Sequence, residues 1–289
     1  MKLLRKTVAL TAALAICMSL ASCSAKKEDN GVAYDKDMKI STVADLEGKA
    51  VAVQLRSGED DYIVIHKLTN YPKRYSDMSK AVQDLIDKKV AAVVVDSYYA
   101  KQLTEGKEGV KILDASVGSV DYRFLLNKSD AKLAEKINAQ IAALKESEDY
   151  QPMIESEMAG GKSYRVAKDS EKELKKTYTL VTEPSFKPFT YQKKGELRGL
   201  FAAMADGIVY GCGGKLDTKT VDPVEINDTV SSSSEVTSFH TNEAQTIKDS
   251  KNAFCVVTSE AAADDTVFVT TDSFYTSNLV IIIRTEEKK

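Results

Sequence analysis

Two short apolar runs with a helical segment between them constrain the fold of this 289-residue chain more than any other feature. The runs cover residues 51–53 and 90–95, and apolar residues recur at helical spacing over 78–86. A β-branched run, a polar turn that contains glycine and a helix form a βα unit, and two such units in succession form a parallel sheet with helices on its faces. Residues 45–96 therefore predict an α/β lobe.

Polar residues follow both predicted strands. Ser57 stands between the first strand and the start of a helix, and Asp96 ends the second run. In parallel sheets, ligands bind beyond the carboxyl ends of the strands. A helix N-terminus also offers free N–H groups to a carboxylate or a phosphate. The alternative for both residues is a helix cap, which is worth about 1 kcal/mol.

The first 22 residues have the pattern of a secretion signal. Basic residues precede an apolar stretch at 8–20, which is too short for a stable membrane-spanning helix. Residues 20–23 read LASC and match a lipobox, so we expect cleavage after residues 1–22 and acylation of Cys23. Residues 23–40 are mostly polar and predict a lipidated, flexible tether that holds the protein at the extracytoplasmic face of the cell membrane.

The composition excludes several classes of protein. The formal net charge is −3, without the basic excess that nucleic acid binding requires. Apart from Cys23, only Cys212 and Cys255 follow the signal, and His66 and His240 are the only histidines, so neither a metal site nor a cofactor is predicted. The two cysteines can pair in an oxidising compartment, but two buried small apolar residues are the better interpretation. The sequence also lacks a nucleophile motif and a phosphate-binding glycine loop, so an enzyme is not the first expectation.

The rest of the chain predicts a second group of α and β elements. Between 162 and 176, lysine and glutamate dominate and apolar residues are few, which predicts an exposed linker. The predicted strands cover 110–113, 121–126, 179–181 and 279–283, and the predicted helices cover 132–144 and 150–158.

Four segments resemble parts of one protein family. Residues 45–54 read DLEGKAVAVQ and residues 92–97 read AVVVDS. These strings resemble the second lobe of extracellular solute-binding proteins of the polar amino acid type, which are the capture components of ABC importers. Residues 179–189 read TLVTEPSFKPF and resemble the beginning of that family, and residues 272–283 resemble the end of its first half. The two halves stand in swapped order, which predicts a circular permutation over nearly all of the mature chain.

The resemblance implies an α/β, two-lobed periplasmic-binding-protein-like fold in which each lobe is a mostly parallel sheet flanked by helices. We expect a monomer, with a domain-swapped dimer as the alternative because a permuted hinge can be exchanged between chains. The implied parts are the family's second lobe at 41–120, a hinge strand at 121–128, helices of the other lobe at 129–160, a linker at 161–176, and the family's first lobe at 177–289, ending in a hinge strand.

The resemblance also implies a ligand-binding site. The aspartate that matches Asp96 pairs with the ammonium group of the ligand in this family, and the turn at Ser57 contacts the carboxylate. Phe189 and Tyr191 match an aromatic wall over the ligand, although core packing is a strong alternative for an aromatic residue. Thr258 and Ser259 match small polar residues of the family that bind the ligand. Arg56 stands where the family usually has glycine, and it either supplies a charge to the cleft or points to solvent. Tyr98 follows Asp96 and is a further candidate for the lining of the cleft.

One departure bears on the ligand. The family carries an arginine that forks onto the α-carboxylate of the ligand, but no arginine or lysine lies between Lys251 and Arg284 here. A site without that arginine should bind a free carboxylate poorly, because a buried unpaired anion is costly. Arg56 then becomes the candidate partner of a carboxylate.

The predicted function is a lipid-anchored, extracytoplasmic solute-binding protein that captures a small polar, amino-acid-like solute for an ABC permease. The first alternative is a degenerate interaction or sensory module without transport, which the absent arginine favours. The second is an enzyme on the same fold that uses a cleft acid, with Glu183 and Glu260 as the acids best placed by sequence.

Overall fold

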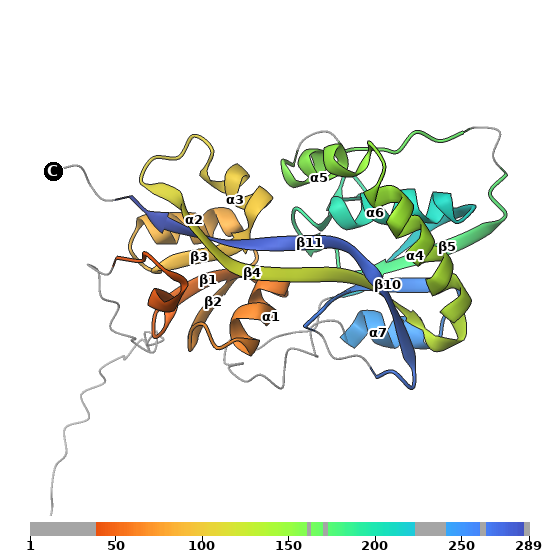
Figure 1. Cartoon of the computed structure of the whole chain (residues 1–289), viewed down its shortest axis with the longest axis horizontal. Coiled ribbons are helices and arrows are strands. Elements are labelled where there is room, and N and C mark those ends of the chain that lie inside the picture. The colour runs from red at the N-terminus through yellow and green to blue at the C-terminus, as the bar shows by residue number, and fades with distance from the viewer. Residues whose placement is uncertain (1–38, 161–162, 170–172, 223–240, 261–263, 286–289) are drawn as a thin grey trace, which may run out of the picture. The chain divides into compact units, whose positions relative to one another are not determined.

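The computed structural model describes residues 39–160, 163–169, 173–222, 241–260 and 264–285 (Figure 1). The predicted signal, Cys23 and the tether up to residue 38 lie outside these ranges. None of the helices in the described part of the chain combines the length and the apolar character that a membrane span requires.

The first lobe contains three parallel strands, in the order β2-β1-β3. Its elements are the 3-10 helix η1 (Val43–Leu46), β1 (Ala50–Gln54), α1 (Gly58–Ile65), β2 (Tyr71–Tyr75), α2 (Met78–Ile86), β3 (Ala92–Asp96) and α3 (Ser97–Thr104). Strands β1 and β3 are buried at every position, as their continuous apolar runs predict.

Strand β2 was not predicted from the sequence. It reads YPKRY, is partly exposed along its length, and pairs only with β1 at the edge of the sheet. An edge strand tolerates proline and charged residues, because one side of it makes no ladder. Its composition therefore resembles that of a loop.

The second lobe repeats this arrangement with the parallel order β9-β5-β10. Its strands are β5 (Lys176–Thr182), β9 (Gly214–Thr220) and β10 (Ala253–Thr258), and its helices are α4 (Ala131–Lys145), α5 (Tyr150–Met158), α6 (Leu200–Gly211) and α7 (Thr241–Lys248). A small antiparallel sheet, β6 (Ser185–Phe186), β7 (Thr190–Lys193) and β8 (Glu196–Arg198), stands between β5 and α6 in the chain.

Two long strands connect the lobes. β4 (Val110–Asn127) and β11 (Phe268–Arg284) pair antiparallel from end to end and run side by side between the lobes (Figure 1). β11 also pairs antiparallel with β3, and β4 pairs antiparallel with β10. The lobes therefore have matching strand orders, β2-β1-β3-β11-β4 and β9-β5-β10-β4-β11, with β4 and β11 exchanging places.

The long strands correct two sequence predictions. Residues 110–113 and 121–126 belong to one 18-residue strand. The segment between them contains mostly small and polar residues, and it forms a strand because β11 supplies its hydrogen bonds. Residues 279–283, expected as part of a hinge strand at the end of the second lobe, belong to β11 and extend past the hinge to lie against β3 of the first lobe. At about 3.3 Å per residue, a 17-residue strand is long enough to reach across both lobes.

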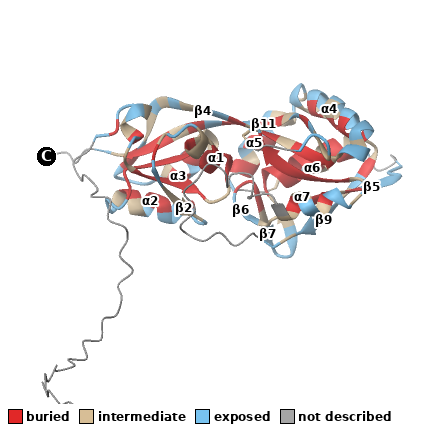
Figure 2. Cartoon of the chain, turned by 90° about the horizontal axis from the view of Figure 1, so that it is seen from below, coloured by how far each residue is buried: buried red, intermediate tan, exposed pale blue. Residues whose placement is uncertain are grey.

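Helices cover both faces of the combined sheet. A large core joins the sheet to α2, α3, α4, α5 and α6, while smaller cores join it to η1 and α1 in the first lobe and to α7 in the second. The buried strands run through the middle of the molecule, and the exposed residues gather on the outer sides of the helices (Figure 2).

Candidate functional site

The carboxyl ends of the parallel strands of both lobes face each other across a cleft. Gln54 ends β1, and its Nε2 donates to the backbone oxygen of Lys187 at 2.6 Å. Thr258 ends β10, and its Oγ1 donates to Asp61 Oδ2 at 3.0 Å. These hydrogen bonds bring together the strand ends at which ligands bind in open α/β sheets. The cleft is closed in this structure.

A second set of contacts closes the cleft on the side of α3. Gln102 Nε2 donates to the backbone oxygen of Ala159 at 3.0 Å, and Gln151 Nε2 donates to Tyr98 Oη at 2.6 Å. Tyr98 and Gln102 belong to the first lobe, whereas Gln151 and Ala159 belong to α5 and its end in the second. Tyr98, a predicted site residue, therefore holds the lobes together at this side.

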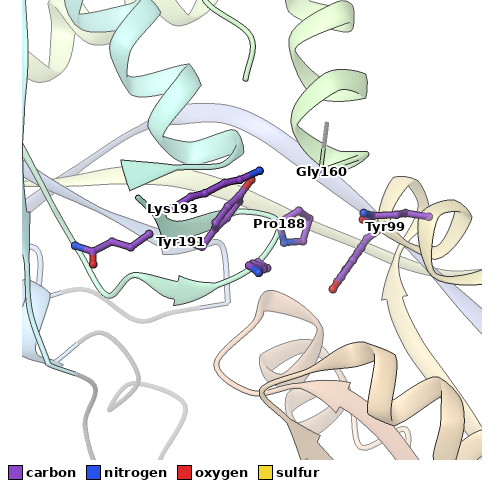
Figure 3. Close-up of a pocket in the computed structure, with 8 residues that line it drawn as sticks. Tyr99, Gly160, Pro188, Tyr191 and Lys193 are labelled. Carbon is purple, nitrogen blue, oxygen red and sulfur yellow. The ribbon is translucent and has the colours of Figure 1, made fainter. Parts of the chain in front are cut away.

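Closure leaves a void of about 260 Å³ between the lobes. Tyr99 lines it from the first lobe, and Pro188, Tyr191 and Lys193 line it from the second (Figure 3). Its volume is near the lower end of the range of small-molecule sites. Lys187 Nζ lies 5.3 Å from the centroid of the Tyr191 ring and also lines the void. Two lysines and two tyrosines make this void suitable for a small ligand with an anionic or polar group.

A second, smaller void of about 30 Å³ lies where Arg56 enters the second lobe. Arg56 Nη1 is 2.9 Å from Glu183 Oε2, and both side chains are nearly buried, with exposed fractions of 12% and 11%. Space of this size holds one or two water molecules. The void is too small for an amino acid in the closed state, so a ligand of that size can enter here only when the lobes move apart or Arg56 leaves.

The first turn of α1 contributes three buried acids that the sequence analysis did not select. Burial raises the pKa of Glu59 to about 7 and raises the pKa of Asp61 well above its usual value. Asp60 pairs with Arg74, whose Nε donates a bifurcated hydrogen bond to the two carboxylate oxygens, at 2.7 and 2.9 Å. Glu59 Oε2 and Asp61 Oδ1 have no hydrogen-bond partner among the described residues. Consecutive acids at a helix start ordinarily face solvent and favour the helix dipole, so their sequence carried no signal of burial.

Asp96 and Ser57 are both helix caps in this structure. Asp96 Oδ1 accepts hydrogen bonds from the N–H groups of Tyr98 and Tyr99, and Oδ2 accepts from Tyr275 Oη at 2.6 Å and Ser277 Oγ at 2.7 Å. Burial raises the pKa of Asp96 despite these four bonds. Its carboxylate is fully buried and already bonded to the protein, so binding a cationic ligand would require some of these bonds to break.

Ser57 accepts a hydrogen bond from Asp60 N–H, and its own hydroxyl donates to Gln54 O at 2.8 Å. The side chain is fully buried at the start of α1. This geometry is the helix cap that the sequence analysis gave as the alternative to ligand binding.

The other predicted site residues occupy different parts of the second-lobe surface of the cleft. Phe189 is fully buried and packs against Tyr122, at 5.4 Å between ring centroids, and against Phe201, at 5.1 Å. Tyr191 lines the larger void. Ser259 continues the ladder beyond β10, since its N–H donates to Asp121 O at 2.8 Å. Phe189 thus has the core position that was the alternative for it, while Tyr191 is available to a ligand.

The described residues contain no group of three or more His, Cys, Asp or Glu side chains that could hold a metal ion. Cys212 and Cys255 do not form a disulfide, and Cys255 is fully buried.

No family model matches the sequence. The chain is similar to an ABC-type phosphate transport receptor from Vibrio cholerae, with 7% identity over 83% of this chain and 88% of that chain and a TM-score of 0.36. It is also similar to NikA from Staphylococcus aureus in complex with Ni(L-His)2 (13% identity, 65% of this chain, 40% of that chain, TM-score 0.35). A third similar structure is full-length CbnR in complex with its target DNA (11% identity, 84% of this chain, 65% of that chain, TM-score 0.41). Matches at these scores carry no argument about ligand or partner.

The fold is α/β and two-lobed. Each lobe has three parallel strands, antiparallel crossing strands and helices on both faces, which confirms the predicted fold class. The circular permutation and the relation to the polar amino acid family stay predictions.

Proposed function

We propose that this protein captures a small polar solute between its two lobes, as the solute-binding component of an ABC importer. One observation carries the proposal. Two lobes of matching strand order present the carboxyl ends of their parallel strands to the same cleft, and β4 and β11 are the segments of chain that cross between the lobes. Two strands form a hinge about which rigid lobes can open and close around a ligand.

The finer parts of the proposal come from the sequence. The lipobox supports anchoring through Cys23 at the extracytoplasmic face of a membrane, and the swapped halves support a permuted member of the polar amino acid family. In that setting an ABC permease is the partner that receives the solute. The void at Tyr99 and Tyr191, with Lys187 beside it, is the candidate site for the anionic end of an amino-acid-like solute.

A solute screen tests this function. We expect at least one compound among amino acids, amines, short peptides and organic acids to raise the melting temperature, since a ligand at 100 times its Kd stabilises the native state by about 2.7 kcal/mol. The same compound should change the small-angle scattering profile, because the cleft must open and close around it.

Two tyrosine variants make the screen specific to the cleft. Tyr191→Ala should weaken the binding of the compound found in the screen, because Tyr191 lines the larger void beneath Lys187. Tyr210→Ala is the matched control, since Tyr210 also lies beneath a lysine, Lys168, but does not line either void. Equal weakening by both variants would place the ligand outside the cleft.

The closed cleft favours a second candidate function, an interaction or sensory module without transport. The side chains of the protein already fill much of the cleft, and the void at Arg56 has a volume of only about 30 Å³. If no compound shifts the melting temperature of a cooperatively folded protein, this candidate replaces transport. Catalysis stays a third hypothesis, and product formation lost in both Glu183→Gln and Glu260→Gln would support it.

A further inference from the structure

The side chain of Arg56 crosses the cleft near the end of β1. It follows the strand by two positions and takes a φ of 61°, a left-handed conformation that is uncommon for residues other than glycine. Its guanidinium group enters the second lobe and pairs with Glu183 at 2.9 Å. Arg56 therefore belongs to one lobe by its backbone and lines a pocket that is otherwise made by hinge and second-lobe residues.

The pocket that receives Arg56 has the composition of a cation site. Besides Glu183 it contains a second acid, Glu243 in the first turn of α7, which is 6% exposed. Phe186 and Phe201 supply aromatic surface, and Thr190 is 1% exposed with an Oγ1 that has no hydrogen-bond partner among the described residues. A guanidinium group carries several planar N–H donors that suit carboxylates and also packs against aromatic rings.

The state of Glu243 depends on the cation. Burial, together with the smaller effect of the nearby Glu183, raises its pKa to about 7, although the charge of Arg56 acts in the opposite direction. Two acids this close are poorly stable as neighbouring anions without a positive charge between them. The pocket is therefore built to hold a cation, and Arg56 supplies it in the closed state.

We propose that this pocket, lined by Glu183, Glu243 and Thr190, is a binding site for a guanidinium or alkylammonium group, and that Arg56 occupies it as a tethered substitute when no ligand is bound. The extension to a natural solute with such a group rests on the proposed function, but the pocket itself does not. A tethered competitor has an effective concentration in the millimolar range, so Arg56 lowers the affinity of the pocket for free cations and holds the lobes closed.

The two roles considered for Arg56 predict opposite results. If Arg56 binds the carboxylate of a ligand, as inferred from the sequence, its removal weakens the binding of acidic ligands. If it is a tethered occupant, its removal strengthens the binding of cations. Loss of the bond to Glu183 should also let the lobes separate more readily in the absence of ligand.

The test is a titration of Arg56→Ala with methylguanidinium chloride. Calorimetry and the melting temperature measure the binding, and potassium chloride at the same ionic strength is the control titrant. We expect Arg56→Ala to bind methylguanidinium with a Kd of about 0.1 mM. The wild-type protein should bind it about tenfold more weakly, because a tethered competitor at an effective concentration of about 1 mM raises the apparent Kd by that factor. Arg56→Lys should resemble the wild type, because it retains a tethered cation. The double variant Arg56→Ala, Glu183→Gln should lose the binding.

Further variants keep the result decisive. Arg123→Ala is the matched control, since Arg123 lies in the hinge strand and pairs with Asp121 instead of entering the pocket. If Arg56→Ala folds poorly, Arg56→Gln removes the charge and keeps a polar side chain. Equal responses of Arg56→Ala, Arg123→Ala and wild type, or binding that survives Glu183→Gln, would overturn the proposal. A solute screen in which no compound binds would contradict the proposed transport function, but it would not change the interpretation of the methylguanidinium titrations.

Discussion

Replacing Asp96 by alanine is expected to lower the free energy of unfolding by about 4 kcal/mol, the size reached when a buried polar network is broken. The substitution removes the cap of α3 and leaves the hydroxyl groups of Tyr275 and Ser277 without their acceptor inside the protein. Each buried polar group that loses its partner costs about 1–3 kcal/mol. Because these hydroxyl groups belong to β11, the loss also weakens the contact between the first lobe and the hinge. Chemical denaturation followed by circular dichroism measures the change.

A second helix cap provides the control. Asp77 caps α2 by accepting from Ser79 N–H at 2.9 Å, and this bond is exposed to solvent. Asp77→Ala should cost only about 1 kcal/mol, the ordinary value of an N-cap. Asp96→Asn should fall between the two alanine variants, because the amide oxygen can still cap α3. If Asp96→Ala costs no more than Asp77→Ala, the bonds to β11 contribute nothing and Asp96 is free to serve a ligand.

Replacing Glu59 by glutamine is expected to remove a large part of the pH dependence of stability. Burial raises the pKa of Glu59 from 4.5 to about 7, so between these values the native state holds a proton that the unfolded chain releases. The free energy of unfolding therefore falls as the pH rises from about 4.5 to 7, by up to about 3 kcal/mol for this one group. Glutamine keeps the shape of the protonated acid and does not ionise. The variant should match the wild type near pH 4.5 and exceed its stability above pH 7.

Denaturant titrations from pH 4.5 to 8 test this expectation. Glu47→Gln is the control for an exposed glutamate. Glu243→Gln should remove a further part of the pH dependence of the free energy of unfolding, since burial also raises the pKa of Glu243 to about 7. A wild-type slope that persists in Glu59→Gln would show that Glu59 is ionised in the native state, contrary to the effect of its burial on the pKa.

Periodic segments were predicted well because local chemistry specifies them. The helices predicted at 78–86 and 150–158 have those bounds in α2 and α5. In α2 the apolar positions Met78, Ala81, Val82 and Leu85 lie on one buried face, and Asp77 provides the cap. Strands β1 and β3 likewise follow from continuous apolar runs that require burial on both faces.

The sequence predicted where the residues of the candidate site lie better than it predicted the partners to which they bond. Ser57, Arg56, Asp96 and Thr258 do lie at strand ends around the cleft, because parallel strands bring their carboxyl ends to one edge. Their partners come from distant parts of the chain, however. Asp96 bonds to residues about 180 positions away, and Arg56 pairs with a residue 127 positions away, and no local pattern encodes such separations.

The chain encodes locally the strands β1, β3 and β5, the helices α2, α4 and α5, and the polar residues that follow β1 and β3, since hydrophobic periodicity and capping act over a few residues. The tertiary structure alone decided that residues 110–127 and 268–284 become two strands that cross between the lobes, because the middle of each is stabilised by the other. It also decided which acids are buried. Glu59 and Glu243 have the sequence context of ordinary helix starts, and their raised pKa values arise from desolvation when the lobes pack around them. Burial is a property of the assembled surface, and this is why the chemistry of the cleft emerged only with the fold.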